Sequence, residues 1–227
     1  MELQIEVSDT VGSVSGILLH PPDAWLIYVL AHGAGAGMRH PFLETMSASL
    51  EARGVATLRY QFPYMEAGRK RPDVPAVLEA TVRAAVGRAR ELAPGLATIA
   101  GGKSMGGRMT SGAAAERALP GVGGLVFLGF PLHPPGRPGT SRADHLARVD
   151  LPLLFLQGSR DDFARLDLIT DVCEELGRDA TLHVVEDADH SFAVPRRSGR
   201  ARDQVIDELA QAITGWARTR VPRTVSP

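Results

Sequence analysis

Short, continuously apolar segments recur along the chain, and longer segments with helical periodicity separate them. The apolar segments predict six strands, at residues 25–33, 55–62, 97–104, 124–130, 151–158 and 180–187. Several of them are apolar at nearly every position instead of at alternate positions, which is typical of parallel strands that helices cover on both faces. This pattern restricts the fold more than any other feature, because it requires a sheet that is buried on both sides.

The segments between these strands complete an α/β pattern. Helical periodicity predicts helices at residues 41–53, 74–92, 105–118, 163–176 and 203–216, and two further N-terminal strands, LQIEVSD and SVSGILLHP, predict a hairpin. A chain of 227 residues that is 44% hydrophobic can build one sizeable core. We therefore expect a doubly wound, mostly parallel sheet flanked by helices, in a single domain over residues 1–219 with a frayed tail over 220–227.

Charge and cysteine content exclude several classes of partner and site. The net charge of −1 gives no global field that would recruit nucleic acid or an anionic membrane. The chain has one cysteine, Cys173, so no internal disulfide and no cysteine-based metal site can form. The N-terminus lacks the basic and apolar pattern of a signal peptide, and the most apolar stretch is too short to span a bilayer. We expect a cytoplasmic protein without nucleic-acid or membrane partners.

The segment AGGKSMGGRM (100–109) fits two motifs that give Ser104 different roles. A phosphate-binding loop needs a glycine five positions before Gly102, where this chain has Ala97, and the intervening residues continue a strand. A nucleophile elbow of the Gly-x-Ser-x-Gly type needs a strand before the serine and a helix after it, and both are predicted here. The elbow is therefore the stronger interpretation, and the nucleotide-binding loop is the weaker one.

A hydrolase elbow requires an acid and then a histidine later in the chain. Asp161 and Asp162 follow the strand that ends at Gly158, and His190 follows the last predicted strand. These residues would lie at the carboxyl end of the sheet, where such folds bind ligands. Both aspartates could instead be helix caps; we assign the acid to Asp161 and the cap of the helix beginning at Phe163 to Asp162.

Two backbone N–H groups must face the oxyanion that forms when a serine attacks a carbonyl. The residue after the nucleophile, Met105, would supply one of them. The loop HGAGAGMRHP (32–41) would supply the other from Ala34, with Gly33 as the next choice, because its small residues let the backbone approach a substrate. A flexible turn without a catalytic role is the alternative for this loop.

Six motifs together resemble the α/β-hydrolase superfamily, in its dienelactone-hydrolase-like branch: LAHGAGAGMRHPF, LRYQFPYMEAGR, GGKSMGGRM, LGFPLHPPG, QGSRDDF and DADHSF. Within that branch the chain is most similar to a group of predicted hydrolases that includes a testis-expressed protein and a subunit of the NSL histone-acetyltransferase complex. The resemblance implies Ser104 as the nucleophile, Asp161 as the acid and His190 as the base. Dienelactone hydrolase itself uses a cysteine nucleophile, whereas Cys173 falls in a predicted helix, so that substrate is not inherited.

The resemblance also places residues 62–65 and 130–136 near the site. From these segments and the oxyanion loop we expect a substrate pocket lined by His32, Phe62, Tyr64, Met65, Phe130, Leu132 and His133. Many α/β-hydrolases insert a helical lid at the position of residues 131–150, but four prolines disfavour a continuous helix in the first half of this segment. We therefore expect little or no lid.

The sequence predicts a serine hydrolase of the carboxylesterase or thioesterase type. Its substrate would be a small ester, thioester or related acyl compound, short-chained and water-soluble, and the reaction would need no cofactor and no metal. The alternative is a non-catalytic binding module that has kept the α/β-hydrolase fold.

Overall fold

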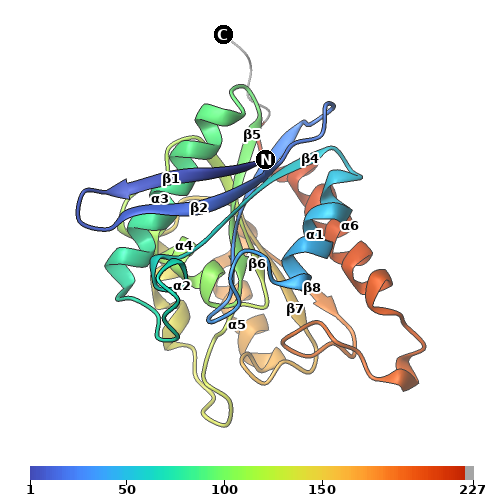
Figure 1. Cartoon of the computed structure of the whole chain (residues 1–227). Coiled ribbons are helices and arrows are strands. Elements are labelled where there is room, and N and C mark those ends of the chain that lie inside the picture. The colour runs from blue at the N-terminus through green and yellow to red at the C-terminus, as the bar shows by residue number, and fades with distance from the viewer. Residues whose placement is uncertain (223–227) are drawn as a thin grey trace.

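The computed structural model describes residues 1–222 and contains an eight-stranded sheet (Figure 1). The strands are β1 (Glu2–Ser8), β2 (Gly12–Leu19), β3 (Leu26–Ala31), β4 (Val55–Tyr60), β5 (Ala97–Lys103), β6 (Val122–Leu128), β7 (Leu153–Gly158) and β8 (Ala180–Val185). Their order is β1-β2-β4-β3-β5-β6-β7-β8, and β2 pairs antiparallel with both β1 and β4. All other pairs are parallel, which confirms the predicted mostly parallel sheet and the N-terminal hairpin.

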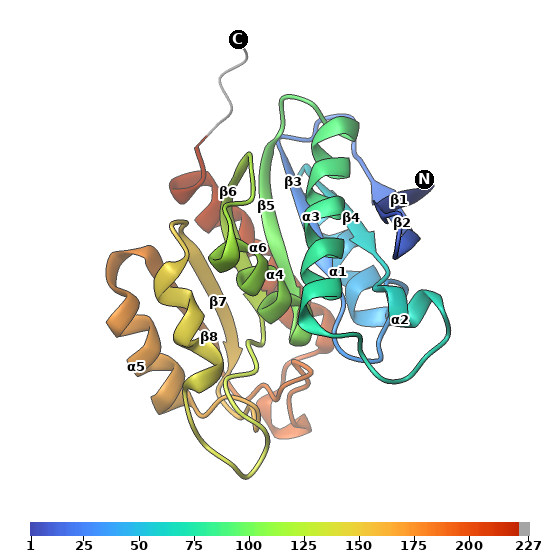
Figure 2. The same cartoon turned by 90° about the vertical axis from the view of Figure 1, so that its left-hand side faces the viewer.

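Helices cover both faces of this sheet. They are α1 (Pro41–Glu51), α2 (Pro63–Glu66), α3 (Pro75–Leu92), α4 (Met105–Glu116), α5 (Leu166–Leu176) and α6 (Arg202–Arg220), with short 3₁₀ helices η1 (Ser141–Arg148), η2 (Gly177–Asp179) and η3 (Arg196–Ser198). Figure 2 shows α3, α4 and α5 in front of the sheet, with α1 and α6 behind it. The buried apolar residues form two clusters accordingly, one on each face.

The register of the central strands determines where the functional loops meet. Ala31, the last residue of β3, is paired with Gly102 of β5, and Gly102 is paired with Phe127 of β6. Every residue of β3 is buried, as expected for a strand covered on both faces. Because the parallel strands end at the same edge, the segments after β3, β5, β7 and β8 are brought together there.

The structure corrects the start of the helix expected from Phe163. Helix α5 begins at Leu166 and its N-cap is Arg165, so Asp162 does not cap it. The N–H of Phe163 instead donates to Asp161 Oδ1 at 2.7 Å, which folds this segment into a turn before the helix begins. The hydrogen bond from a side chain to the backbone before α5 is therefore made by Asp161, and Asp162 is exposed.

The segment between β6 and β7 carries a single 3₁₀ helix, η1, so the fold has no helical lid. At the C-terminus, α6 continues through Arg220, one residue beyond the expected end of the domain. Most of the tail that was expected to be frayed, residues 223–227, lies outside the described residues.

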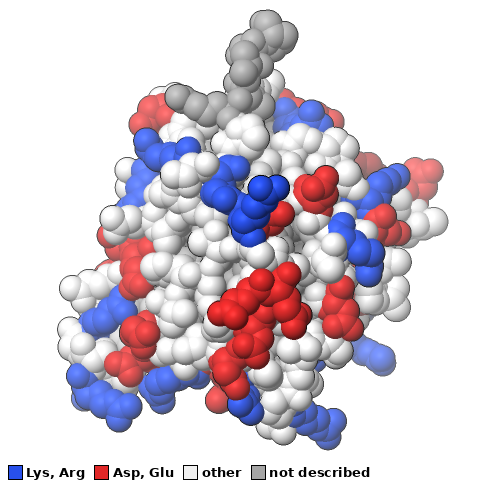
Figure 3. Space-filling model, turned by 180° about the vertical axis from the view of Figure 1, so that it is seen from behind, with Lys and Arg blue, Asp and Glu red and all other residues white. Residues whose placement is uncertain are grey.

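The exposed surface mixes charges of both signs. On the face shown in Figure 3, basic and acidic side chains are both scattered, and the largest group of acidic side chains lies in the lower centre of the view. Within residues 1–222, no helix is both long enough and apolar enough to cross a membrane.

Two helix glycines provide a matched test of how closely α4 packs against β3. A Cβ at Gly106 would lie 2.7 Å from the carbonyl oxygens of Ala31 and His32, whereas a Cβ at Gly87 in α3 would meet nothing within 4 Å. We expect Gly106→Ala to lower the free energy of unfolding by about 2 kcal/mol or more, because the helix must move away from the strand. Gly87→Ala should raise it by about 0.5–1 kcal/mol through helix propensity. Urea denaturation measures both, and equal effects would contradict this packing.

Candidate active site

Ser104 occupies the turn between β5 and α4. Its backbone has φ 50° and ψ −117°, a conformation that residues with a side chain rarely adopt. The turn is held by the Ser104 N–H, which donates to the carbonyl oxygen of Leu128 at 3.1 Å. A Cβ at Gly102 would lie 2.8 Å from the Cβ of Ala31, so this position, like Gly106, accepts only glycine without movement. The two glycines let the strand and the helix approach β3 and project the serine above the sheet.

Three predicted residues meet at this turn. His190 Nε2 lies 2.9 Å from Ser104 Oγ, and His190 Nδ1 lies 2.7 Å from Asp161 Oδ2. The arrangement requires the Nδ1–H tautomer, in which Nδ1 donates to the carboxylate and Nε2 accepts from the hydroxyl. The side chain of Asp161 is fully buried and that of His190 is 19% exposed, so the serine end of the chain of hydrogen bonds faces the solvent.

Asp161 receives two further hydrogen bonds that fix its orientation. Gln157 Nε2 donates to Oδ2 at 2.5 Å, and the Phe163 N–H donates to Oδ1. The other end of the Gln157 amide accepts from the N–H of Phe130 at 3.0 Å. The sequence motifs did not include Gln157. Its polar side chain inside the otherwise apolar strand LLFLQG is the feature that could have identified it.

The loop that carries His190 is tightly organised. Asp189 Oδ1 accepts from the N–H groups of Ser191 and Ala193 at 2.8 and 2.9 Å. The ring of Phe192 stacks on that of Phe42 in α1, with centroids 5.7 Å apart. Because the backbone on both sides of His190 is held, the imidazole can keep its position between the other two residues.

The Gly/Ala-rich loop after β3 lies directly against the serine. A Cβ at Gly33 would lie 3.7 Å from the Cβ of Ser104. The N–H of Gly35 donates to the hydroxyl of Tyr64 at 2.9 Å, which ties the loop to α2. Over residues 1–222, no hydrogen bond of the protein uses the N–H of Ala34 or Met105. These two groups are therefore free to donate to a ligand.

His32 has a structural role instead of the expected place in the pocket lining. It is fully buried, and its ring bridges two loops: Nδ1–H donates to the Gly33 carbonyl at 2.7 Å, and Nε2 accepts from the Phe62 N–H at 3.1 Å. Burial lowers the pKa of the imidazole from 6.5 to about 4, so the ring is neutral. With both nitrogens hydrogen-bonded, His32 holds the loop after β3 in place and has no free ring nitrogen.

A cavity of about 300 Å³ opens beside Ser104. Its apolar wall comes from Phe42 and Leu43 of α1 and from Phe163, whose ring lies 4.3 Å from that of His190. The remaining lining residues are small or polar: Gly33, Ala34, Ala36, His40, Lys103 and Ser191. The first turn of α1 therefore forms part of the apolar wall of this cavity, and the position of Pro41-Phe42-Leu43 directly after the Gly/Ala-rich loop could have indicated it.

The structure corrects the expected pocket lining, because the expected residues do not line this cavity. Four of them are buried in the core below it, namely Phe62, Tyr64, Phe130 and Leu132. Met65 packs against the same core. The ring of His133 donates through Nδ1 to the Pro134 carbonyl and accepts through Nε2 from the Arg165 N–H. These side chains therefore lie outside the wall of the cavity beside Ser104.

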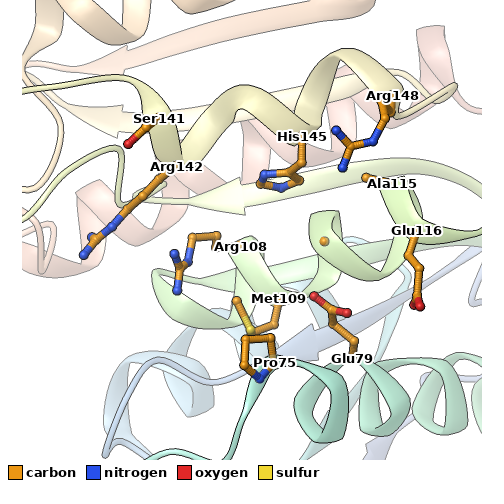
Figure 4. Close-up of a pocket in the computed structure, with 11 residues that line it drawn as sticks. Pro75, Glu79, Arg108, Met109, Ala115, Glu116, Ser141, Arg142, His145 and Arg148 are labelled. Carbon is orange, nitrogen blue, oxygen red and sulfur yellow. The ribbon is translucent and has the colours of Figure 1, made fainter.

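A larger groove of about 770 Å³ lies between α3, α4 and η1 (Figure 4). Its charged and polar lining comes from Glu79, Arg108, Glu116, Ser141, Arg142, His145 and Arg148. Ser104, Asp161 and His190 do not line this groove. Over the described residues 1–222, no group of three or more His, Cys, Asp or Glu side chains could hold a metal ion.

Comparison with known proteins agrees with the fold. The profile of a family described as an alpha/beta hydrolase domain matches residues 25–218. The chain therefore belongs to the α/β-hydrolase family.

Three solved structures with the same fold are distant in sequence. Dienelactone hydrolase from Anabaena variabilis is 23% identical, with a TM-score of 0.75 over 98% of this chain and 99% of that one. An α/β serine hydrolase without a lid from Xanthomonas campestris is 20% identical, with a TM-score of 0.75 over 100% and 96%. The esterase domain of a Rhodothermus marinus protein is 17% identical, with a TM-score of 0.72 over 98% and 99%. These similarities establish the lidless fold, and they do not identify the reaction.

The buried neutral His32 predicts sensitivity to acid. Its pKa in the folded state is about 4, below that of the unfolded chain, so the unfolded state binds the extra proton as pH falls below about 6.5. This loss of stability should reach on the order of 3 kcal/mol by pH 4. His32→Gln removes the titrating group, so its unfolding free energy should fall less steeply over the same range. Equal slopes for the two proteins would contradict the neutral, fully bonded ring.

Proposed function

We propose that the protein is a serine hydrolase that cleaves small esters, thioesters or related acyl compounds. The observation that carries the proposal is the continuous chain of hydrogen bonds from Ser104 Oγ through His190 to the buried carboxylate of Asp161. This arrangement activates a hydroxyl that is otherwise a weak nucleophile.

In the proposed reaction, His190 Nε2 accepts the hydroxyl proton while Ser104 Oγ attacks the carbonyl carbon of the substrate. Asp161 keeps the imidazole in the required tautomer and stabilises the imidazolium. The unused N–H groups of Met105 and Ala34 donate to the oxyanion. His190 then protonates the leaving group, and the acyl-enzyme is hydrolysed by a water that gives its proton to the same nitrogen. No cofactor takes part in this scheme.

The cavity beside Ser104 supports a short acyl group. It measures about 300 Å³, at the lower limit for ligand pockets, and its apolar wall consists mainly of Phe42, Leu43 and Phe163. The structural relatives described as a dienelactone hydrolase and an esterase domain agree with acyl chemistry. A closer relationship to the group that includes the testis-expressed protein and the NSL-complex subunit is part of this proposal.

The alternative role, a binding module without activity, fits the site less well. A binding module has no need for a strained serine, an aligned imidazole and a buried, fully hydrogen-bonded acid in one place.

Replacing the nucleophile tests the proposal. Ser104→Ala should reduce kcat on p-nitrophenyl acetate by on the order of 10⁶, because the residual rate comes only from binding and the oxyanion donors. The matched control is Ser141→Ala, which removes a hydroxyl from the groove lining at the start of η1. Circular dichroism should show that both variants are folded. An Ser104→Ala variant that keeps most of the activity would refute the mechanism.

The size of the cavity predicts a preference for short chains. Each methylene that the cavity holds adds about 0.8 kcal/mol of burial, so kcat/KM should rise over the first few carbons and then stop rising. The measurement is kcat/KM for p-nitrophenyl esters from acetate to palmitate. A steady increase to the longest chain would show that the acyl group binds outside the cavity lined by Phe42 and Phe163.

A further inference from the structure

The chain has only two lysines, Lys70 and Lys103, and all its other basic residues among the 25 Lys and Arg are arginines. Lys103 is the last residue of β5 and immediately precedes Ser104. Its ammonium lies close to Asp161 and His190, as distances from a single point beside Gly129 show. A Cβ built on Gly129 would lie 3.1 Å from Lys103 Nζ, 3.5 Å from Asp161 Oδ2 and 3.5 Å from His190 Cε1. The ammonium, the carboxylate and the imidazole therefore surround one point.

Lys103 lines the cavity beside Ser104 and is only partly buried. Over residues 1–222, neither a hydrogen bond nor an ion pair reaches Lys103 Nζ, which lies 5.6 Å from the centre of the Phe192 ring. Burial lowers the pKa of the group from 10.5 to about 8, and the charges of Asp161 and Asp189 oppose this change. A partly desolvated charge without a hydrogen-bonded partner is unfavourable, so its position beside Asp161 and His190 calls for a reason beyond stability.

We propose that Lys103 is a positioning residue whose charge controls the protonation of the Asp161–His190 pair. A cation at this position favours the ionised carboxylate of Asp161 and opposes a second positive charge on His190. The imidazole therefore remains neutral, and able to accept the serine proton, at a lower pH than it would without Lys103. This inference rests on the proposed function, because it assigns a role within the same triad.

The groups that face Lys103 make the direction of the effect clear. Asp161 and Asp189 are the negative charges near it, His190 is the group that becomes positive, and Gly129 and Phe192 contribute no charge. An ammonium on a flexible stem fits this narrow space, whereas the planar guanidinium of arginine is larger. The use of lysine here, in a chain that otherwise uses arginine almost exclusively, agrees with that requirement.

Lys103→Met and Lys70→Met form a matched pair, because each removes one ammonium and Lys70 lies in an exposed loop. In Lys103→Met, the acid limb of the kcat/KM profile should move to higher pH by about one unit, which corresponds to a roughly tenfold loss of activity on that limb. Lys70→Met should reproduce the wild-type profile. An acid limb that stays in place or moves to lower pH in Lys103→Met would overturn the inference.

A second measurement does not depend on activity. The NMR titration of the His190 ring, assigned from the signal that disappears in His190→Gln, should shift upward by the same amount in Lys103→Met. If the wild-type protein proved inactive, the proposed function would fail, but this titration would still decide the role of Lys103. An unchanged His190 titration midpoint in the folded variant would contradict it.

The reciprocal titration covers the case in which Lys103→Met does not fold. Isotope-labelled wild-type protein gives two lysine signals, and Lys70 serves as the internal control. Asp161→Asn removes the negative charge that favours the ammonium, so the midpoint of Lys103 should fall while that of Lys70 stays constant. Equal behaviour of the two lysines would show that Lys103 and the catalytic pair are not coupled.

Discussion

The close approach of α4 to the end of β3 is the constraint on which the site depends. Gly102 and Gly106 let the backbone on either side of Ser104 pack against Ala31 and His32, and no larger side chain fits at either position without movement. The same contact forces Ser104 into a strained conformation and places it beside the oxyanion loop. Ser104 and the loop after β3, the proposed nucleophile and the proposed source of an oxyanion donor, are therefore positioned by one packing interaction between a strand, a helix and that loop.

Around this contact, buried polar groups hold the reacting side chains in place. His32 fixes the oxyanion loop, Gln157 orients Asp161, and Asp189 organises the turn that carries His190. His32 and Lys103 have lowered pKa values because desolvation disfavours their charged forms. A site of this kind gives up some stability for a defined arrangement of charges, as enzymes commonly do. Its organisation is more specific than binding alone would require.

The features that the sequence predicts well are those set by local rules. Continuous apolar strands such as β3 indicated the parallel sheet, and glycines on both sides of Ser104 indicated the turn between strand and helix. Chain order placed Asp161 and His190 after successive strands, and the shared strand edge brings them together. These inferences needed only periodicity and the geometry of parallel sheets. Their catalytic roles remain a proposal.

The sequence could not locate features that depend on packing between distant segments. Phe62 and Phe130 follow strands at the correct edge, yet their rings turn into the core, and the cavity wall comes from α1 instead. The start of α5 was misplaced because Asp161 binds the Phe163 N–H and so delays the helix. Gln157 and Lys103 have neighbours in space that no spacing rule identifies. In each case, the side chain's surroundings, and not its place in the chain, decide what it does.

The most direct test of the central claim is to react the native protein with a fluorophosphonate probe and to locate the adduct by peptide mass spectrometry. The probe reacts only with a serine whose hydroxyl is activated by a neighbouring base, and the chain contains many other serines as internal controls. The account predicts a single adduct on Ser104 that is absent after acid unfolding of the protein before labelling. No adduct, or an adduct on another serine, would contradict it.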